Sequence, residues 1–228
     1  KLILIIRIIL SQMKLKITSS ALRSLCHLMK AGIHYYDNMI QRFLNDLLLF
    51  DDIKIVCNTC RIIGFIDCPT IQYCETCFNR IFNDFENESI YHTFLKVLIR
   101  KHQEWSGFMQ DIINETILFQ STCTTKPFLK NLYLQVMLLY FPFNQSFDER
   151  MCDLLLFFLN DPSQTHQILT SLQIWMSEAT FEDGEKETFI ELIENGMDDF
   201  NIILQEGNQD LVLMTSEFLK NFEVFKQN

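Results

Sequence analysis

The chain has 228 residues, of which 48% are hydrophobic and 21% are charged. This composition excludes an intrinsically disordered chain, which combines low hydrophobicity with high charge. The net charge of −10 argues against a uniformly basic nucleic-acid-binding protein. With only six Gly and four Pro there are few turns, so the composition favours long helices.

The first ten residues (KLILIIRIIL) are mostly apolar, but the segment is too short to span a bilayer and Arg7 interrupts it. It also lacks the small-residue cleavage pattern of a secretory signal. We interpret it as a buried first helix or strand and expect no membrane partner. Eight cysteines without a secretory signal indicate a reducing compartment, so we expect a nuclear or cytoplasmic protein with free thiols.

A short internal repeat indicates a period of about forty residues. Residues 42–47 (RFLNDL) recur 38 positions later as residues 80–85 (RIFNDF), and a third copy (FLND) lies at residues 158–161. A period of this length is that of a two-helix HEAT unit.

Apolar residues at three-and-four spacing predict an unpaired first helix followed by five helix pairs. The first helix is expected at residues 17–31, with residues 18–20 (TSS) as candidate N-cap residues. Pro127 is tolerated because it falls in the first turn of its helix. The predicted pairs are residues 37–50 with 53–66, 70–85 with 89–102, 104–120 with 126–141, 148–159 with 164–177, and 185–205 with 210–225.

No segment shows sustained alternation of polar and apolar residues, so the predicted fold class is all-α, an α-α superhelix of about five helix pairs. Residues 1–36 are expected to form a basic and apolar helical segment, and residues 37–228 a HEAT-like repeat array. The apolar start and the unpaired first helix indicate that more of the solenoid lies upstream.

The predicted second helix of the first pair resembles the HEAT-repeat family. In that family this helix carries Asp, an aliphatic residue three positions later, a small residue, two aliphatic residues, Gly and a final aliphatic residue. The matching positions here are Asp52, Ile55, Thr59, Ile62, Ile63, Gly64 and Ile66. Gly64 fits because neighbouring helices in such stacks approach closely near the helix end. The resemblance implies an armadillo-like solenoid whose second helices line the concave surface.

Two CxxC pairs form the one metal-like constellation. Cys57 and Cys60 are separated by thirteen residues from Cys74 and Cys77, and four thiolates can hold tetrahedral zinc. Zinc knuckles turn tightly, whereas both pairs fall within helical patterns in which a spacing of three places each pair on one face. We interpret these cysteines as core residues and expect no metal, with a zinc site as the alternative.

The sequence contains no signature of catalysis: no phosphate-cradling Gly-rich loop, no HExxH and no GxSxG. The acidic residues Glu187, Glu191, Glu194 and Asp198 share one helical face, which we interpret as a solvated surface. The histidines have no partner at a useful spacing; they are His27, His34, His92, His102 and His166. We therefore expect neither an enzyme nor a cofactor.

Charge is distributed unevenly along the chain. Residues 1–36 contain six Lys or Arg and no acid, whereas residues 178–228 contain thirteen Asp or Glu and three Lys. The predicted second helices of the first three pairs contain Lys and Arg but no Asp or Glu. The spacing of these basic residues places neighbours on one face of each helix. Because fields are screened beyond about 8–10 Å at physiological salt, such a stripe would attract a polyanion despite the net charge. The candidate polyanion-binding residues are Lys54, Arg61, Lys96, Arg100, Lys101, Lys126 and Lys130.

Nucleic-acid phosphate is the first candidate ligand, bound through its backbone without base readout. An acidic peptide is the second. The third interpretation is that these residues only solubilise the surface.

Residues 21–160 resemble the HEAT region of the G-type non-SMC subunit of condensin. The resemblance rests on the unit that ends Ile62-Ile63-Gly64 and on residues 135–142 (QVMLLYFP). It implies a chromosome-organising subunit that grips duplex DNA on a basic groove and is clasped by an extended kleisin segment, while its SMC partners carry the ATPase.

Two alternatives remain open. A karyopherin- or armadillo-type transport receptor or adaptor would bind a peptide on its inner wall, and its acidic end would attract basic cargo. A purely architectural scaffold is the other.

Overall fold

The computed structural model describes residues 15–32, 44, 46–66, 88–123, 126–141, 143 and 145–227. Within these residues every regular element is an α-helix, which confirms the predicted all-α class. β pairing in this part is limited to an isolated bridge between Ser146 and Thr180. None of these helices combines the length and the apolar character needed to cross a lipid bilayer.

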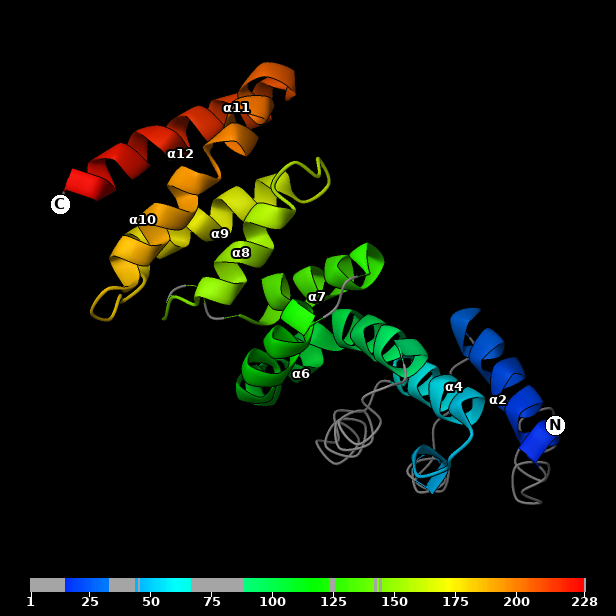
Figure 1. Ribbon diagram of the computed structural model, residues 1–228. Coiled ribbons are helices and arrows are strands. Elements are labelled where there is room, and N and C mark those ends of the chain that lie inside the picture. The colour runs from blue at the N-terminus through cyan, green and yellow to red at the C-terminus, as the bar shows by residue number, and fades with distance from the viewer. Residues whose placement is uncertain are drawn as a thin grey trace. The chain divides into compact units, whose positions relative to one another are not determined.

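The chain divides into two compact units, Lys1–Phe108 (unit 1) and Met109–Asn228 (unit 2). Two predicted helices fall wholly or mostly outside the described residues: residues 70–85 entirely, and residues 37–50 for the greater part. The helices are α2 (Leu15–Lys30), α4 (Ile53–Ile63), α6 (Glu88–Cys123), α7 (Pro127–Tyr140), α8 (Glu149–Phe157), α9 (Thr165–Glu178), α10 (Glu185–Asn195), α11 (Met197–Glu206) and α12 (Gln209–Gln227), as labelled in Figure 1.

Three predicted boundaries were wrong. Helix α6 continues through residue 103, where a turn was expected, because no Gly, Pro or capping residue interrupts it there. The segment 185–205 is instead two helices that meet at Gly196, whose N–H is bonded to the carbonyls of Leu192 and Ile193. Helix α2 begins at Leu15, so the expected N-cap residues 18–20 lie inside it.

Unit 1 is organised around α4. Asp52 caps this helix by accepting hydrogen bonds from the backbone N–H groups of Lys54 and Ile55. Helix α2, expected to precede the array as a separate segment, packs against α4 in the same unit (Figure 1). The apolar faces of both helices are buried, and the charged residues Arg23, Lys30 and Arg61 are exposed.

The C-terminal end of α4 approaches α6 closely at Gly64. A Cβ atom on Gly64 would lie 3.2 Å from Cγ2 of Val97 and 3.3 Å from the carbonyl oxygen of Arg61. The expected close approach of two helices at Gly64 is thus confirmed. Beyond it, the ammonium of Lys101 donates to the carbonyl of Ile66, which joins the same two segments.

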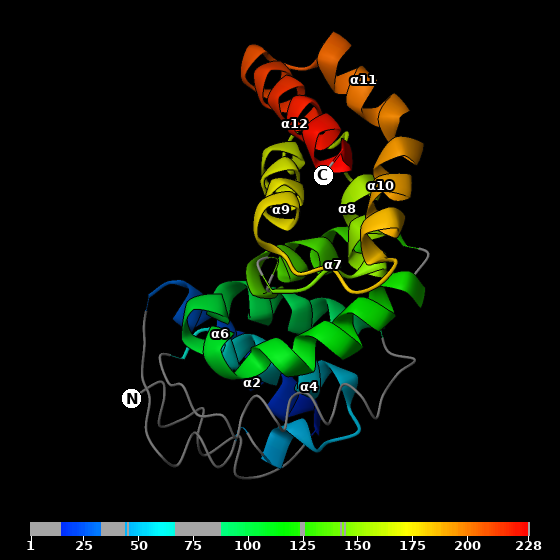
Figure 2. The ribbon, with the colours of Figure 1, turned by 90° about the vertical axis from the view of Figure 1, so that its left-hand side faces the viewer.

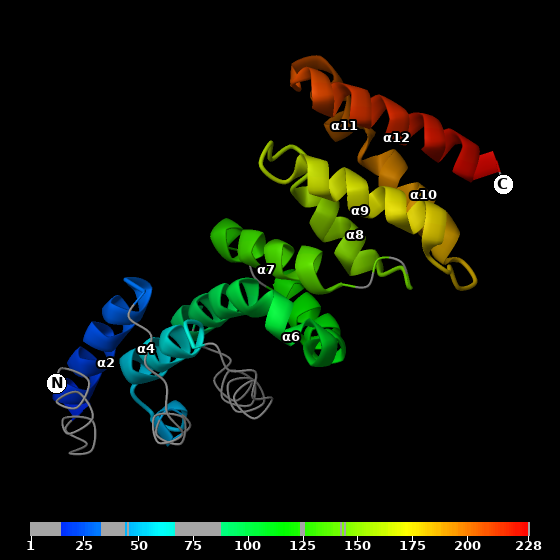
Figure 3. The same cartoon turned by 180° about the vertical axis from the view of Figure 1, so that it is seen from behind.

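The helices of unit 2 form two rows. Helix α9 contacts both α7 and α12 in one row, and α8 contacts α10 in the other. Figure 2 shows α9 and α12 on one side and α8 and α10 on the other, and Figure 3 shows α7, α9 and α12 in succession. Helix α11 contacts α10 and α12 and so connects the rows at the C-terminal end.

An aromatic cluster fills the space between these rows. The ring of Trp175 on α9 lies 5.3 Å from Phe147 and 6.1 Å from Phe189 of α10, both in edge-on arrangements. Phe189 also lies 5.8 Å from Phe225 of α12. The indole N–H of Trp175 donates to the carbonyl of Ser146 at 2.9 Å, which satisfies the polar edge of a fully buried ring. These edge-on pairs therefore tie α9, α10 and α12 together.

The contact at Gly64 makes a testable prediction for stability. We expect Gly64→Leu to lower the free energy of unfolding by about 1–3 kcal/mol, because the larger side chain must displace Val97. The double variant with Val97→Ala should recover much of the loss. Urea denaturation measures both; a Gly64→Leu protein as stable as the parent would contradict the close contact.

Candidate anion-binding site

One exposed face of α2 carries three basic or titratable side chains. Arg23, His27 and Lys30 follow one another at spacings of four and three, which places them on the same side of the helix. All three are exposed, whereas Leu22 and Leu25 face the core. The register of the helix therefore places Arg23, His27 and Lys30 on the face that is turned toward solvent.

Helix α4 contributes a second group of side chains, which begins with Asn58 and Arg61. Asn58 is almost fully buried, and its amide oxygen accepts a hydrogen bond from Nη1 of Arg61 at 3.1 Å. The amide nitrogen of Asn58 in turn donates to the carbonyl of Ser19 on α2 at 3.4 Å. Asn58 thus holds the guanidinium of Arg61 and links α4 to α2. One turn further on, the half-buried ring of Phe65 lies on the same side.

Helix α6 supplies the third face. His92, Lys96 and Arg100 recur every four residues, and Lys96 and Arg100 are exposed. The guanidinium carbon of Arg100 lies 4.0 Å from the ring centroid of Phe65, a cation–π contact between α6 and the end of α4. This contact restrains Arg100 beside the residues of α4.

The three faces enclose a cavity of about 410 Å³, here called the basic pocket. Five Lys or Arg and two His line it, and no Asp or Glu among the described residues does. None of the five basic side chains forms an ion pair with a carboxylate of the described part of the chain. The lining residues are Arg23, Cys26, His27, Lys30, Asn58, Arg61, Phe65, His92, Thr93, Lys96, Val97 and Arg100.

The positive side chains of the pocket influence the pKa values of two neighbouring groups, His92 and Cys26. Burial lowers the pKa of His92, and the positive charges of Lys96 and Arg61 lower it further. For Cys26, burial raises the pKa of the thiol, while Arg61, Arg100 and Lys30 act in the opposite direction by stabilising a thiolate. Burial is the larger cause in both groups, and the neighbouring positive charges act beside it.

Three of the seven predicted polyanion-binding residues, Arg61, Lys96 and Arg100, come together in the basic pocket. Lys54 is exposed on α4 but does not line it. Lys126 and Lys130 belong to unit 2, where Lys126 is the N-cap residue of α7. Whether one stripe joins the residues of the two units stays a prediction.

The inclusion of Lys101 was wrong. Its side chain is only 3% exposed, and its ammonium donates to the carbonyl of Ile66 and to the carboxylate of Glu104, at 2.7 Å from Oε1. A lysine that is buried and already paired is not available to an external anion. Its role is to join α6 to the end of the α4 segment.

Of the Lys, Arg and His residues that line the pocket, four were not predicted from the sequence: Arg23, His27, Lys30 and His92. The acid-free first 36 residues and the four-and-three spacing on α2 were the signal for the first three. The spacing shows that these residues share one face of α2, but it does not show against which other helix that face lies.

The first CxxC pair lies in the core, as interpreted from the sequence. Cys57 and Cys60 are buried on α4, both as free thiols, and Sγ of Cys57 lies 3.5 Å from the carbonyl oxygen of Ser89. Cys74 and Cys77 lie outside the described residues. Across the part of the chain that is described, no cluster of His, Cys, Asp and Glu could hold a metal ion.

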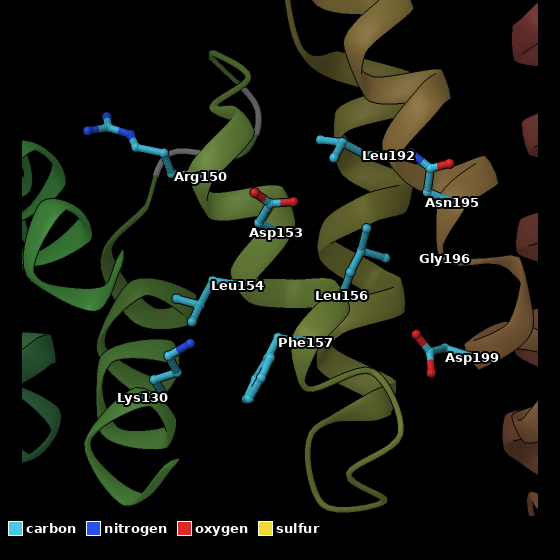
Figure 4. A pocket seen from close by; sticks show the side chains of 10 residues that line it. All are labelled: Lys130, Arg150, Asp153, Leu154, Leu156, Phe157, Leu192, Asn195, Gly196 and Asp199. Carbon is cyan, nitrogen blue, oxygen red and sulfur yellow. The ribbon is translucent and has the colours of Figure 1, made fainter. Parts of the chain in front are cut away.

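A second cavity, of about 500 Å³, lies within unit 2 between α7, α8, α10 and α11. Figure 4 shows Lys130 and Arg150 on one side of it and Asn195 and Asp199 on the other. Asp153 lies between them, and burial raises the pKa of its carboxyl. Two bases and two acids line this cavity, so it has no preference for anions.

Comparisons with known proteins add no family to this description: no family model matches the chain, and no curated protein matches it either.

The pKa of His92 gives a direct probe of the pocket. Because its pKa is lowered, the imidazole is harder to protonate in the folded protein than in the unfolded chain, so His92 costs stability as the pH falls below about 6.5. We expect its titration midpoint, followed by NMR, to lie below 6.5, and Lys96→Gln to raise it. A midpoint above 6.5 in the parent protein would contradict the lowered pKa, and a midpoint that does not rise in Lys96→Gln would contradict the contribution of that charge.

Proposed function

We propose that this protein is a non-catalytic helical-repeat scaffold that binds the phosphate backbone of nucleic acid. The observation that carries the proposal is the basic pocket, in which five Lys or Arg converge from three helices with no lining acid among the described residues. Lys and Arg that neutralise phosphates supply most of the affinity of backbone binding. Such contacts position a nucleic acid without reading its sequence.

A HEAT-type solenoid is the architecture that best fits this role. The two rows in unit 2, with alternate helices in contact, support such a stack. The close approach at Gly64 supports the resemblance of α4 to the second helix of a HEAT unit. A solenoid of this kind offers a long surface for extended ligands.

The condensin-like resemblance gives the proposal its specific form. In that form the chain organises chromosomes in the nucleus, grips duplex DNA through unit 1 and is held by an extended kleisin-type peptide. It hydrolyses nothing itself. The basic pocket supports this form, because a cavity lined by Lys and Arg suits the phosphate backbone of DNA. A peptide receptor of the karyopherin type is the alternative, in which basic cargo would bind at the acidic end of the chain.

Fluorescence anisotropy with a labelled duplex of unrelated sequence tests the proposal. We expect binding that weakens steeply from 50 to 200 mM salt, because each neutralised phosphate adds about 0.9 to the slope of log affinity against log salt. Lys96→Glu and Arg61→Glu should each lower the affinity at least tenfold and flatten that slope.

Lys54→Glu is the matched control, because Lys54 is exposed on the same helix as Arg61 but outside the pocket. It should bind like the parent protein. A parent that binds no duplex, or a Lys54→Glu variant as weak as Arg61→Glu, would refute the proposal.

A further inference from the structure

We propose that the basic pocket is a site for a compact polyphosphate, a small molecule carrying three or more phosphate groups. This inference deepens the proposed function and rests on it for the claim that the pocket binds phosphate. Such a ligand would compete with nucleic acid for the same side chains and thereby regulate its binding.

The size of the pocket favours a small ligand. A sphere of the same volume is about 9 Å across, within the range of small-molecule sites. A duplex is too wide to enter a cavity of this size and would contact it only at the rim. The phosphates of one strand are spaced about 3.4 Å apart along the duplex axis. About two or three of them would therefore lie along the width of the cavity.

The amount of charge leads to the same conclusion. Five Lys or Arg side chains line the pocket. A phosphate monoester carries about −1.5 to −2 at neutral pH, so three such groups carry about −4.5 to −6. A compact polyphosphate therefore matches the charge of the pocket. The two or three phosphates of one nucleic-acid strand, with one negative charge each, would neutralise about half of it.

The side chains are also arranged to hold several phosphates at once. Asn58 restrains Arg61, and Phe65 restrains Arg100, so two guanidinium groups are fixed before a ligand arrives. Guanidinium groups bind phosphate oxygens through paired hydrogen bonds. Arg23 and Lys30 of α2, the helix that packs against α4, line the same cavity.

A bound anion would relieve the repulsion among the basic side chains of the pocket. Like charges that share a cavity without a carboxylate repel one another, and that repulsion opposes folding. A ligand that binds only the folded protein raises its apparent stability with ligand concentration. Removing one pocket charge should therefore stabilise the unliganded protein and weaken the response to ligand.

Calorimetric titration and thermal unfolding with inorganic tripolyphosphate test the inference, with inorganic phosphate at matched ionic strength for comparison. We expect tripolyphosphate to bind at least about a hundredfold more tightly than phosphate, to raise the melting temperature and to displace a labelled duplex. Lys96→Gln should raise the melting temperature of the unliganded protein and reduce tripolyphosphate affinity at least tenfold, whereas Lys54→Gln should do neither.

The possible results separate this inference from the proposed function. Tripolyphosphate that binds no more tightly than phosphate, or that binds the Lys96→Gln variant as well as the parent, overturns the inference even if the duplex binds. Tight tripolyphosphate binding without duplex binding supports the inference and overturns the nucleic-acid role. Displacement of the duplex by tripolyphosphate supports both.

Discussion

The close contact between α4 and α6 at Gly64 determines where the positive charges of unit 1 lie. Gly64 has no side chain, so Val97 of α6 can approach within a distance that a Cβ atom would obstruct. Arg61 lies one turn before Gly64, and Lys96 lies next to Val97 in the chain. The same contact that packs the two helices therefore brings their basic residues around one cavity. If the helices were further apart, each charge would be solvated separately and the field of the pocket would be lost to screening.

The two units differ in charge. Unit 1 contains 13 Lys or Arg and 10 Asp or Glu, whereas unit 2 contains 6 and 19. The net charge of −10 thus comes from unit 2, and it does not describe the surface around the basic pocket. Because charges more than about 8–10 Å apart are largely screened at physiological salt, local arrangement decides which ligands each unit attracts. Among the described residues, Lys and Arg but no Asp or Glu line the cavity of unit 1, whereas two basic and two acidic residues line the cavity of unit 2.

Local sequence patterns predicted the helices, but not the relations between them. The motif from Asp52 to Gly64 correctly indicated a helix with a close approach at its end, and four-residue spacing correctly placed Lys96 and Arg100 on one face. The role of Arg23 could not be predicted, because it depends on the packing of α2 against α4. Lys101 lies one position from Arg100, yet it is buried by contacts with Ile66 and Glu104 that no spacing rule contains. Tertiary packing decides which basic residues of one helix reach a ligand.

The central claim, that the basic residues of α2, α4 and α6 surround one anion-binding cavity, is tested most directly by a crystal structure of the protein soaked in tungstate, whose anomalous signal locates an anion. We expect a tungstate peak within hydrogen-bonding distance of Arg61 and at least one of Arg23, Lys96 and Arg100. Side chains of these residues that point to separate surfaces, or anomalous peaks only elsewhere on the molecule, would contradict it.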